Sequence, residues 1–296
     1  MSQGSASAEL PPLAPPAAST GLLEVFRKRY LLRMLVRNTI KSRYQGTALG
    51  WTWSYLQPAM RFAMFYFVFE VAIGRGGDAV PNFAIHLFCG MILVHFFTET
   101  FNGGTASLVR NRSLIGKLPM PKELFPVSRM MVSLWHTGPM LVILLVGCLA
   151  LGWRPDLVGV GAGLLAFAIL IPLALALALF FSVLNVFMRD FGKVVGTLTQ
   201  FTTFSVPMIY PYTMVADRFG ETGSQFYLLN PVAEAVLLMQ RCFWVGTHDD
   251  PQHLIDTHFP ADLWARGGIM LVASLAFLGV AQWWFATFEK RVAERL

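Results

Sequence analysis

The sequence predicts an all-α integral membrane protein with six transmembrane helices. Of its 296 residues, 55% are hydrophobic and only 14% are charged, whereas a soluble globular domain carries about 25% charged residues. Six apolar runs each approach the roughly 20 residues that a helix needs to cross a bilayer. The segments between these runs alternate between rich and poor in Lys and Arg, and this bias sets the orientation of membrane helices.

Three regions follow from the distribution of apolar and charged residues. Residues 1–20 are rich in Ala, Pro and Ser and predict a disordered cytoplasmic tail, since they lack the basic start and apolar core of a cleaved signal peptide. Residues 21–50 predict a basic interfacial helix, and residues 51–296 predict the six-helix transmembrane domain. Within that domain, residues 211–266 form one large external segment.

The basic segment carries a regular ridge of cations. Arg29, Arg33, Arg37 and Lys41 recur every four residues, so they lie along one side of a continuous helix. The apolar residues between them form no single stripe, and we expect the helix to wedge between lipid and protein. The ridge has two interpretations. It is either an anchor on the cytoplasmic side or a contact for phosphate-bearing lipid heads, whose oxygens suit arginine.

The six expected spans lie at about 53–74, 83–104, 127–151, 157–188, 194–211 and 267–288. The fourth span has no charged residue and, as a continuous helix, would be about 48 Å long. It is therefore expected to tilt, to kink at Pro172, or to project beyond the membrane.

Charge places both termini in the cytoplasm. Seventeen of the 23 Lys and Arg residues fall before the first span, between the second and third, between the fourth and fifth, or after the sixth. Five fall on the other side: Arg75, Arg154, Arg218, Arg241 and Arg266. The remaining Arg61 lies inside the first span and needs a partner there, and Glu99 on the second span is a candidate by depth.

The external segment contains a short apolar helix at about 230–244. Asn230 suits the N-cap of this helix and Pro231 suits its first position. The helix is too short to span a bilayer and too apolar for free solution. We expect it to lie at the outer interface or to re-enter between the spans.

Two spans carry residues that are unusual for a lipid-facing helix. Tyr55, Phe62, Tyr66 and Phe69 share one face of the first span, which indicates either packing or a transport pathway. The fifth span mixes aromatic rings with hydroxyl and amide groups, and these suit either a hydrated lining or hydrogen bonds between helices. Rings that stack on sugar faces, beside groups that bond sugar hydroxyls, would suit a sugar chain.

Several functions are disfavoured by what the sequence lacks. It contains no phosphate-binding loop, no metalloprotease motif and no serine-hydrolase motif. The three cysteines have no metal-ligand spacing, and we expect no cofactor in this chain. The net charge of +6 is concentrated in short loops with no basic soluble domain, so we expect no nucleic-acid partner.

The order of these features resembles the membrane subunit of type-2 ABC exporters, and specifically the permeases that export lipid-linked polysaccharide (the Wzm and TagG group, which exports O-antigen, teichoic acid or galactan). The similarity runs from about residue 22 to the C-terminus. The segments that carry it are RNTIKSRYQGTALGWTWSYLQP at 37–58, IGKLPMPKELFPVSRM at 115–130, VFMRDFGKVV at 186–195 and LLNPVAEAV at 228–236.

The resemblance implies a transporter subunit in the bacterial cytoplasmic membrane rather than an enzyme. Two copies would form a channel and pair with two copies of a separate ATPase, which binds ATP and Mg²⁺. The cargo would be a polysaccharide on a polyprenyl diphosphate. Two alternatives stay open: a type-2 exporter of a drug or free lipid, and a membrane-embedded polyprenyl-phosphate transferase.

The resemblance also assigns expected roles to individual residues. The diphosphate or lipid head would meet Arg37, Lys41 and Arg43. The channel would be lined by Tyr55, Phe62, Tyr66, Phe69, Gln200, Phe201, Thr203 and Phe204. The ATPase would contact Arg110, Arg112, Lys117, Arg189, Asp190 and Lys193. From the residues alone, these last six are expected to belong to charged loops that fix the topology, and Asp190 is expected to form a salt bridge within its loop.

Overall fold

The computed structural model describes residues 21–72, 80–117 and 120–295, and within them every regular element is a helix. The predicted all-α class is therefore confirmed. The expected tail at 1–20 and Arg75 lie outside the described residues. The side chain of Phe69, predicted to line the channel, also lies outside them.

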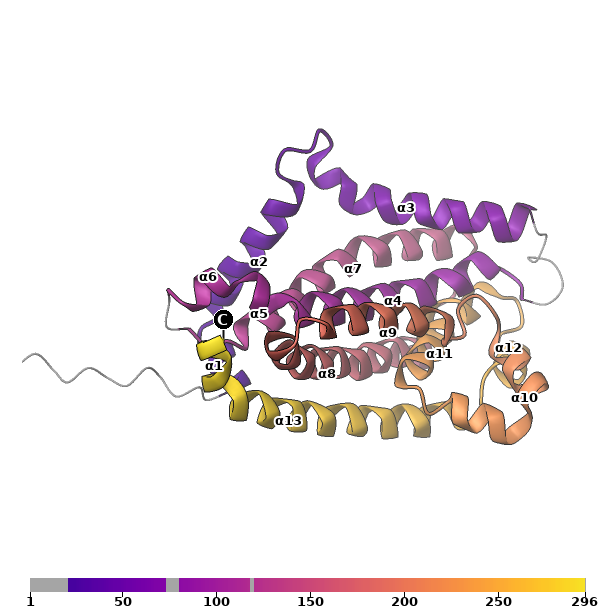
Figure 1. Ribbon diagram of the computed structural model, residues 1–296. Coiled ribbons are helices and arrows are strands. Elements are labelled where there is room, and N and C mark those ends of the chain that lie inside the picture. Colours follow the sequence, from indigo (N-terminus) through magenta and orange to yellow (C-terminus); the bar gives the residue numbers. More distant parts are fainter. Residues whose placement is uncertain (1–20, 73–79, 118–119, 296) are drawn as a thin grey trace, which may run out of the picture.

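Four long helices run alongside one another and form the body of the molecule (Figure 1). They are α4 (Phe83–Thr105), α7 (Leu124–Ala150), α8 (Leu157–Phe187) and α13 (Leu263–Arg295). All four are long and apolar enough to cross a membrane. The approach of α4 to α8 depends on Gly104, since a Cβ there would lie only 2.3 Å from Cβ of Ala178. Continuous α8 contains Pro172, so this proline does not end the helix.

The first and fifth expected spans are helical but short. The first consists of α3 (Trp53–Tyr66), which contains Pro58, and the π-helical η2 (Phe67–Ala72) that continues it. The fifth is α9 (Phe191–Phe204), and the predicted extension to residue 211 is wrong, because regular helix ends at Phe204. Neither is among the four helices of the described chain that are long and apolar enough to cross a membrane, so the six-span count stays a prediction.

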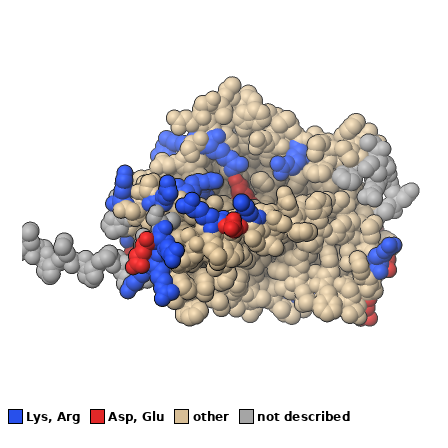
Figure 2. Space-filling model, in the orientation of Figure 1, with Lys and Arg blue, Asp and Glu red and all other residues tan. Residues whose placement is uncertain are grey.

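One end of the bundle collects the short basic elements, and we call it the basic end. It holds α1 (Leu22–Arg27), α2 (Arg29–Tyr44), α5 (Ser107–Arg110), α6 (Arg112–Ile115) and the last turns of α13 (Figure 1). Helix α2 lies obliquely to the bundle and contacts α7, and a loop with η1 (Gly50–Thr52) leads on to α3. Figure 2 shows Lys and Arg gathered over this end. Both ends of the described chain therefore lie on the basic side.

The opposite end is built from α10 (Tyr212–Tyr227), α11 (Pro231–Phe243), η3 (Val245–Thr247) and α12 (Pro251–His258) (Figure 1). The predicted N-cap of α11 is confirmed, since Oδ1 of Asn230 accepts a hydrogen bond from N of Val232 at 3.0 Å. Helix α11 is buried from Val232 to Cys242 and packs on α4, α8 and α13. This packing among the long helices fits re-entry between the spans, and the position of α11 relative to the membrane stays a prediction.

Candidate functional site

A charged cluster sits in the half of the bundle nearest the basic end. Glu99 of α4 accepts a hydrogen bond from Nη1 of Arg43 at 2.5 Å, and Nδ1 of His136 lies 3.0 Å from the same oxygen. Nε2 of His95, one turn before Glu99, lies 3.7 Å from its other oxygen. The expected pairing of Arg61 with Glu99 is wrong, because Arg43 at the end of α2 occupies that place.

The cluster joins three elements that are far apart in sequence. Arg43 lies in the last turn of α2, His95 and Glu99 share one side of α4, and His136 comes from α7. Nη1 of Arg43 is also 2.9 Å from Nδ1 of His136. That nitrogen can accept from Arg43 or donate to Glu99, but it cannot do both in one tautomer. The Glu99 carboxylate therefore has either one donor or two, depending on the proton of His136.

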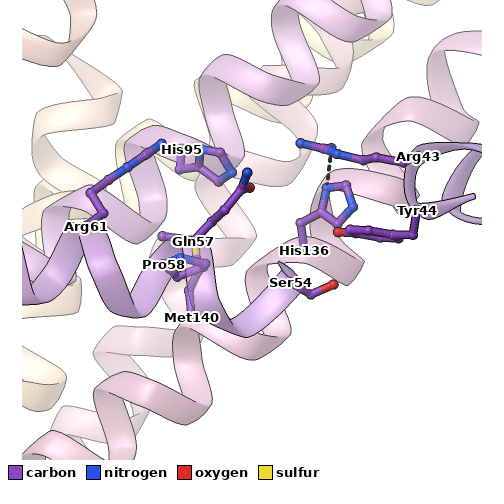
Figure 3. A pocket seen from close by; sticks show the side chains of 9 residues that line it. All are labelled: Arg43, Tyr44, Ser54, Gln57, Pro58, Arg61, His95, His136 and Met140. Atoms are coloured by element: carbon purple, nitrogen blue, oxygen red, sulfur yellow. Dashed lines mark hydrogen bonds between the residues drawn. The ribbon is translucent and has the colours of Figure 1, made fainter. Parts of the chain in front are cut away.

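Arg61 lines a small pocket of about 100 Å³ beside this cluster. Figure 3 shows its guanidinium pointing toward His95, with Gln57 and Pro58 of α3 on the same wall. The positive charge of Arg61 acts on His95. Among the described residues no carboxylate lies within ion-pair distance of Arg61. The structure thus places this arginine at the edge of a polar pocket.

A larger cavity of about 850 Å³ opens on the other side of Glu99, and we call it the basic cavity. Its walls come from α2, α4, α5, α7 and the start of α6. Three arginines line it, Arg43, Arg110 and Arg129, against the single carboxylate of Glu99. Most of its other side chains are amides and hydroxyls: Asn38, Thr39, Ser42, Thr98, Asn102, Asn111 and Ser133. The cavity therefore offers many hydrogen-bonding groups and carries an excess of positive charge.

The structure separates the three cations that were predicted to bind a diphosphate together. Arg37 and Lys41 line a hollow along α2 with Arg33, as the spacing of the ridge predicted. Arg43 instead lines the basic cavity and the small pocket around Arg61. The three side chains therefore line two adjoining hollows, which share Asn38, and their common role stays a prediction.

The aromatic face predicted for α3 is only partly open. Tyr55 and Tyr66 are exposed. Phe62 packs against the core, with its ring centroid 4.7 Å from that of Phe88 on α4. Phe62 therefore fits the interpretation of this face as a packing surface. Among the described side chains of the face, the two tyrosines are the exposed ones.

Helix α9 exposes aromatic rings while most of its hydroxyls bond to its own backbone. Phe201 and Phe204 are 69% and 67% exposed, and Gln200 is also exposed. Thr203 donates to the carbonyl of Thr199 one turn earlier, and other hydroxyls of this helix do likewise. Asn102 of α4 donates from Nδ2 to Oγ1 of Thr199 at 3.0 Å. Of the two predicted uses of these polar groups, bonding between helices holds for Thr199.

The residues predicted to contact an ATPase lie in two places at the basic end. Arg110, Arg112 and Lys117 belong to the α5 and α6 region and are exposed. Arg189, Asp190 and Lys193 form the turn between α8 and α9 and are also exposed. The predicted salt bridge at Asp190 is confirmed, since Nζ of Lys193 lies 3.7 Å from its Oδ1. Figure 1 places both regions at the same end of the bundle.

Buried Asn185 ties these two regions together. Its Nδ2 donates to the carbonyl of Thr105, at the end of α4, at 3.1 Å. Its Oδ1 accepts from N of Gly192, in the first turn of α9, at 3.0 Å. Sequence reasoning missed this residue, although an amide in an uncharged apolar span was a usable signal. Glu99 and His95, four residues apart on an apolar helix, gave a similar signal.

The opposite end is held by a second set of polar contacts. Trp244 is 1% exposed and donates from Nε1 to the carbonyl of Pro81 at 2.7 Å. Nη2 of Arg241 lies 2.8 Å from Oδ2 of Asp156, the N-cap of α8. Although partial burial favours the neutral carboxyl, the hydrogen bond and charge of Arg241 lower the pKa of Asp156 overall. These contacts anchor α11 to the ends of α4 and α8.

Comparison with known proteins settles the family. Residues 30–241 match the model of the ABC-2 type transporter family. The chain belongs to the ABC-2 type transporter family. It is 28% identical over 234 residues to the O-antigen export system permease protein RfbA of Myxococcus xanthus, covering 78% of this chain and 87% of that one. It is 24% identical over 264 residues to a protein of the same name from Klebsiella pneumoniae, covering 86% and 93%.

Membership of the ABC-2 family confirms the resemblance that the sequence motifs indicated. The matched region contains the charged cluster, the basic cavity, helix α9 and nearly all of α11. Together with the long apolar helices, it identifies a multi-pass membrane transporter subunit rather than an enzyme.

Proposed function

We propose that this chain is the channel-forming subunit of an ATP-driven exporter. It moves a polyprenyl-diphosphate-linked polysaccharide from the cytoplasm across the bacterial inner membrane. The observation that carries the proposal is its similarity to O-antigen export permeases over 78% to 86% of the chain. In this proposal the basic end faces the cytoplasm, in line with the positive-inside rule, and α3 with η2 and α9 complete six spans.

The energy source is a separate subunit. The chain has no phosphate-binding loop of its own. Two copies of the permease pair with two copies of a cytoplasmic ATPase. The ATPase binds at Arg110, Arg112, Lys117, Arg189, Asp190 and Lys193. This is supported by the position of both exposed charged regions at the basic end and by the hydrogen bonds of Asn185 between them.

The substrate follows a route from α2 to the exposed rings. Arg37 and Lys41 on the α2 ridge attract phosphate-bearing heads at the membrane surface, and Arg43 lies further in. Tyr55, Tyr66, Gln200, Phe201 and Phe204 line the channel between two copies of the chain, which is supported by their exposure in the single copy. Thr203, Phe62 and Phe69 complete the predicted lining, with Phe62 acting through its packing on α4.

The exposed rings of α9 also suit an apolar cargo, so an exporter of a drug or free lipid is the second candidate. A polyprenyl-phosphate transferase is less well supported, because Asp190 is exposed in a turn and paired with Lys193. Depletion of the chain in cells separates the two transporters. The proposal expects lipid-linked glycan to accumulate in the cytoplasm. Normal surface glycan after depletion, together with accumulation of another lipid, would favour the second candidate.

Partnership with an ATPase is tested by co-expression with candidate ABC ATPase subunits from the same organism and affinity purification through the permease. The proposal expects a stable complex with equal amounts of both chains. Replacing both Arg189 and Lys193 by Ala is expected to weaken this complex. Replacing Arg154 and Arg218, which are also charged but lie at the opposite end, serves as the control and is expected to leave the complex intact.

A further inference from the structure

The basic cavity contains more positive charge than the chain itself balances. Arg43 shares its charge with Glu99 at 2.5 Å. Arg110 and Arg129 have no carboxylate within ion-pair distance in the described part of the chain. The positive charges of Arg110 and Arg43 both act on Arg129, so three cations are crowded around one anion. Crowding of like charges with too few counter-ions is unfavourable unless an anion is bound.

The wall of the cavity holds one of these arginines in place. Arg129 is partly buried on α7, and its aliphatic chain lies over Gly103 of α4, where an added Cβ would be 3.7 Å away. The guanidinium is thus held at the wall by packing of its own stem. Asn102 and Asn111 line the same cavity, and each donates a hydrogen bond to a neighbouring carbonyl.

We infer that the basic cavity binds a phosphate or diphosphate group through the guanidinium groups of Arg110 and Arg129, with the pair of Arg43 and Glu99 on its opposite side. Arginine presents parallel N–H donors that match phosphate oxygens in pairs. Three arginines against one glutamate leave an excess of two positive charges, which one phosphate or diphosphate group would balance. A cavity of about 850 Å³ has room for that group and the first part of an attached chain.

This inference rests on the proposed function. Within that function, the basic cavity is the place where the diphosphate head of the lipid-linked glycan is held. It differs from the surface role of Arg37 and Lys41, which line a separate hollow on α2. The same chemistry could come from a lipid head or from a free phosphate compound. The test therefore uses both kinds of probe.

Binding is measured on the complete permease and ATPase complex in phosphatidylcholine nanodiscs. The ATPase sites are filled with a non-hydrolysable ATP analogue. The probe is a fluorescent prenyl diphosphate of short chain length. The competitors are the unlabelled prenyl diphosphate, inorganic pyrophosphate and a prenol of the same length. Competition by the prenyl diphosphate alone identifies a lipid head, and equal competition by pyrophosphate identifies a free anion. Both outcomes support the site, whereas competition by the prenol as strong as by the diphosphate would overturn it.

The variants Arg129→Gln and Arg110→Gln are each expected to weaken binding of the probe by about 10-fold or more, the effect of losing a charge-assisted hydrogen bond. Arg129→Lys, which keeps the charge but loses the paired donors, is expected to fall between wild type and Arg129→Gln. Arg154→Gln, an exposed arginine at the opposite end, is the matched control and is expected to bind normally. Arg110 is exposed, so its variant keeps the test available if Arg129→Gln does not assemble.

Affinity within twofold of wild type in both Arg110→Gln and Arg129→Gln would overturn the inference. Affinity lost in Arg37→Gln but kept in these two would place the site on the α2 ridge and would also overturn it. Failure of the proposed function looks different. In that case the complex would bind the diphosphate probe with the expected dependence on Arg129, yet cells depleted of the chain would display normal surface glycan.

Discussion

The two ends of the bundle differ in how their charged and polar side chains are paired. At the opposite end, Trp244 and Arg241 anchor α11 by hydrogen bonds of 2.7 Å and 2.8 Å to the ends of α4 and α8. At the basic end, a cavity of about 850 Å³ is lined by arginines, and two of them lack an acidic partner among the described residues. Arginines that face a cavity without a carboxylate partner are suited to binding an anion. The contrast indicates that the opposite end keeps its shape while the basic end receives ligand and partner.

Each end also contains a buried residue that does not follow this difference in pairing. At the opposite end, the carboxyl of Glu234 on α11 is buried, and neither of its oxygens has a hydrogen-bond partner among the described residues. At the basic end, Asn185 is buried and satisfied on both sides of its amide. The basic end therefore combines the basic cavity with a hydrogen-bonded link through Asn185. We call this link the joint, and it lies near the residues that are proposed to bind the ATPase.

The largest expected effect comes from breaking the packing of the opposite end. Trp244→Ala removes a buried ring and a hydrogen bond, and we expect it to lower the free energy of unfolding by about 3–5 kcal/mol. Thermal unfolding of the detergent-purified protein, followed by intrinsic fluorescence or size exclusion, measures this loss. Trp264→Ala is the control, since Trp264 is 45% exposed, and it is expected to unfold near the wild-type temperature. Equal losses in the two variants would contradict the anchoring role of Trp244.

A smaller effect is expected at the joint of the basic end. Asn185→Leu removes two hydrogen bonds. It takes the donor from the buried carbonyl of Thr105 and leaves N of Gly192 with only its 3.3 Å bond to the carbonyl of Arg189, at a cost of about 1–3 kcal/mol. Its specific consequence should be continued ATP hydrolysis with reduced glycan export, because the two ATPase-facing regions are no longer connected.

The control for the joint is Ser182→Ala in the same helix. Ser182 is also buried, but its hydroxyl donates only to the carbonyl of Leu179 within α8. We expect this variant to keep the wild-type ratio of export to hydrolysis. A proportional loss of hydrolysis and export in Asn185→Leu would show that Asn185 supports folding alone and does not connect the two regions.

The smallest expected effect concerns the hydroxyls of α9. Thr199→Val loses the hydrogen bond from Asn102 of α4, and bonds of this kind between membrane helices contribute about 0.6 kcal/mol on average. Thr203→Val loses only a bond to its own helix and should be nearly neutral. Thermal stability of the two variants side by side tests this. A larger loss in Thr203→Val would show that its hydroxyl has a role outside its own helix.

The sequence predicted the class of the fold because composition and the length of apolar runs depend on the membrane and not on detailed contacts. It also predicted the N-cap at Asn230 and the ion pair at Asp190, since both are local. It could not predict that Arg43 rather than Arg61 meets Glu99, because that choice depends on the oblique course of α2. Phe62 shows the same limit: periodicity places it on a face with Tyr66, but the approach of Phe88 decides what that face touches.

The prediction for α9 was incomplete for a different reason. Six hydroxyl and amide side chains in a short span suggested water or partners, yet most of the hydroxyls are satisfied by carbonyls one turn earlier in the same helix. The sequence shows which groups need hydrogen bonds but not where those bonds are found. The cations of the basic cavity were visible as loop and rim residues, whereas their convergence from α2, α5 and α7 required the fold.

We propose that the chain carries a glycan by its lipid diphosphate, which is received at the basic end, and that a separate ATPase drives the transport. The most direct measurement is ATP hydrolysis by the purified permease and ATPase complex in nanodiscs, with and without defined lipid-linked glycans. The account predicts a several-fold stimulation by lipid-linked glycan, little by the free glycan or the prenol, and a loss of stimulation in Arg129→Gln. Stimulation by free lipids or apolar drugs, with none by lipid-linked glycan, would contradict it.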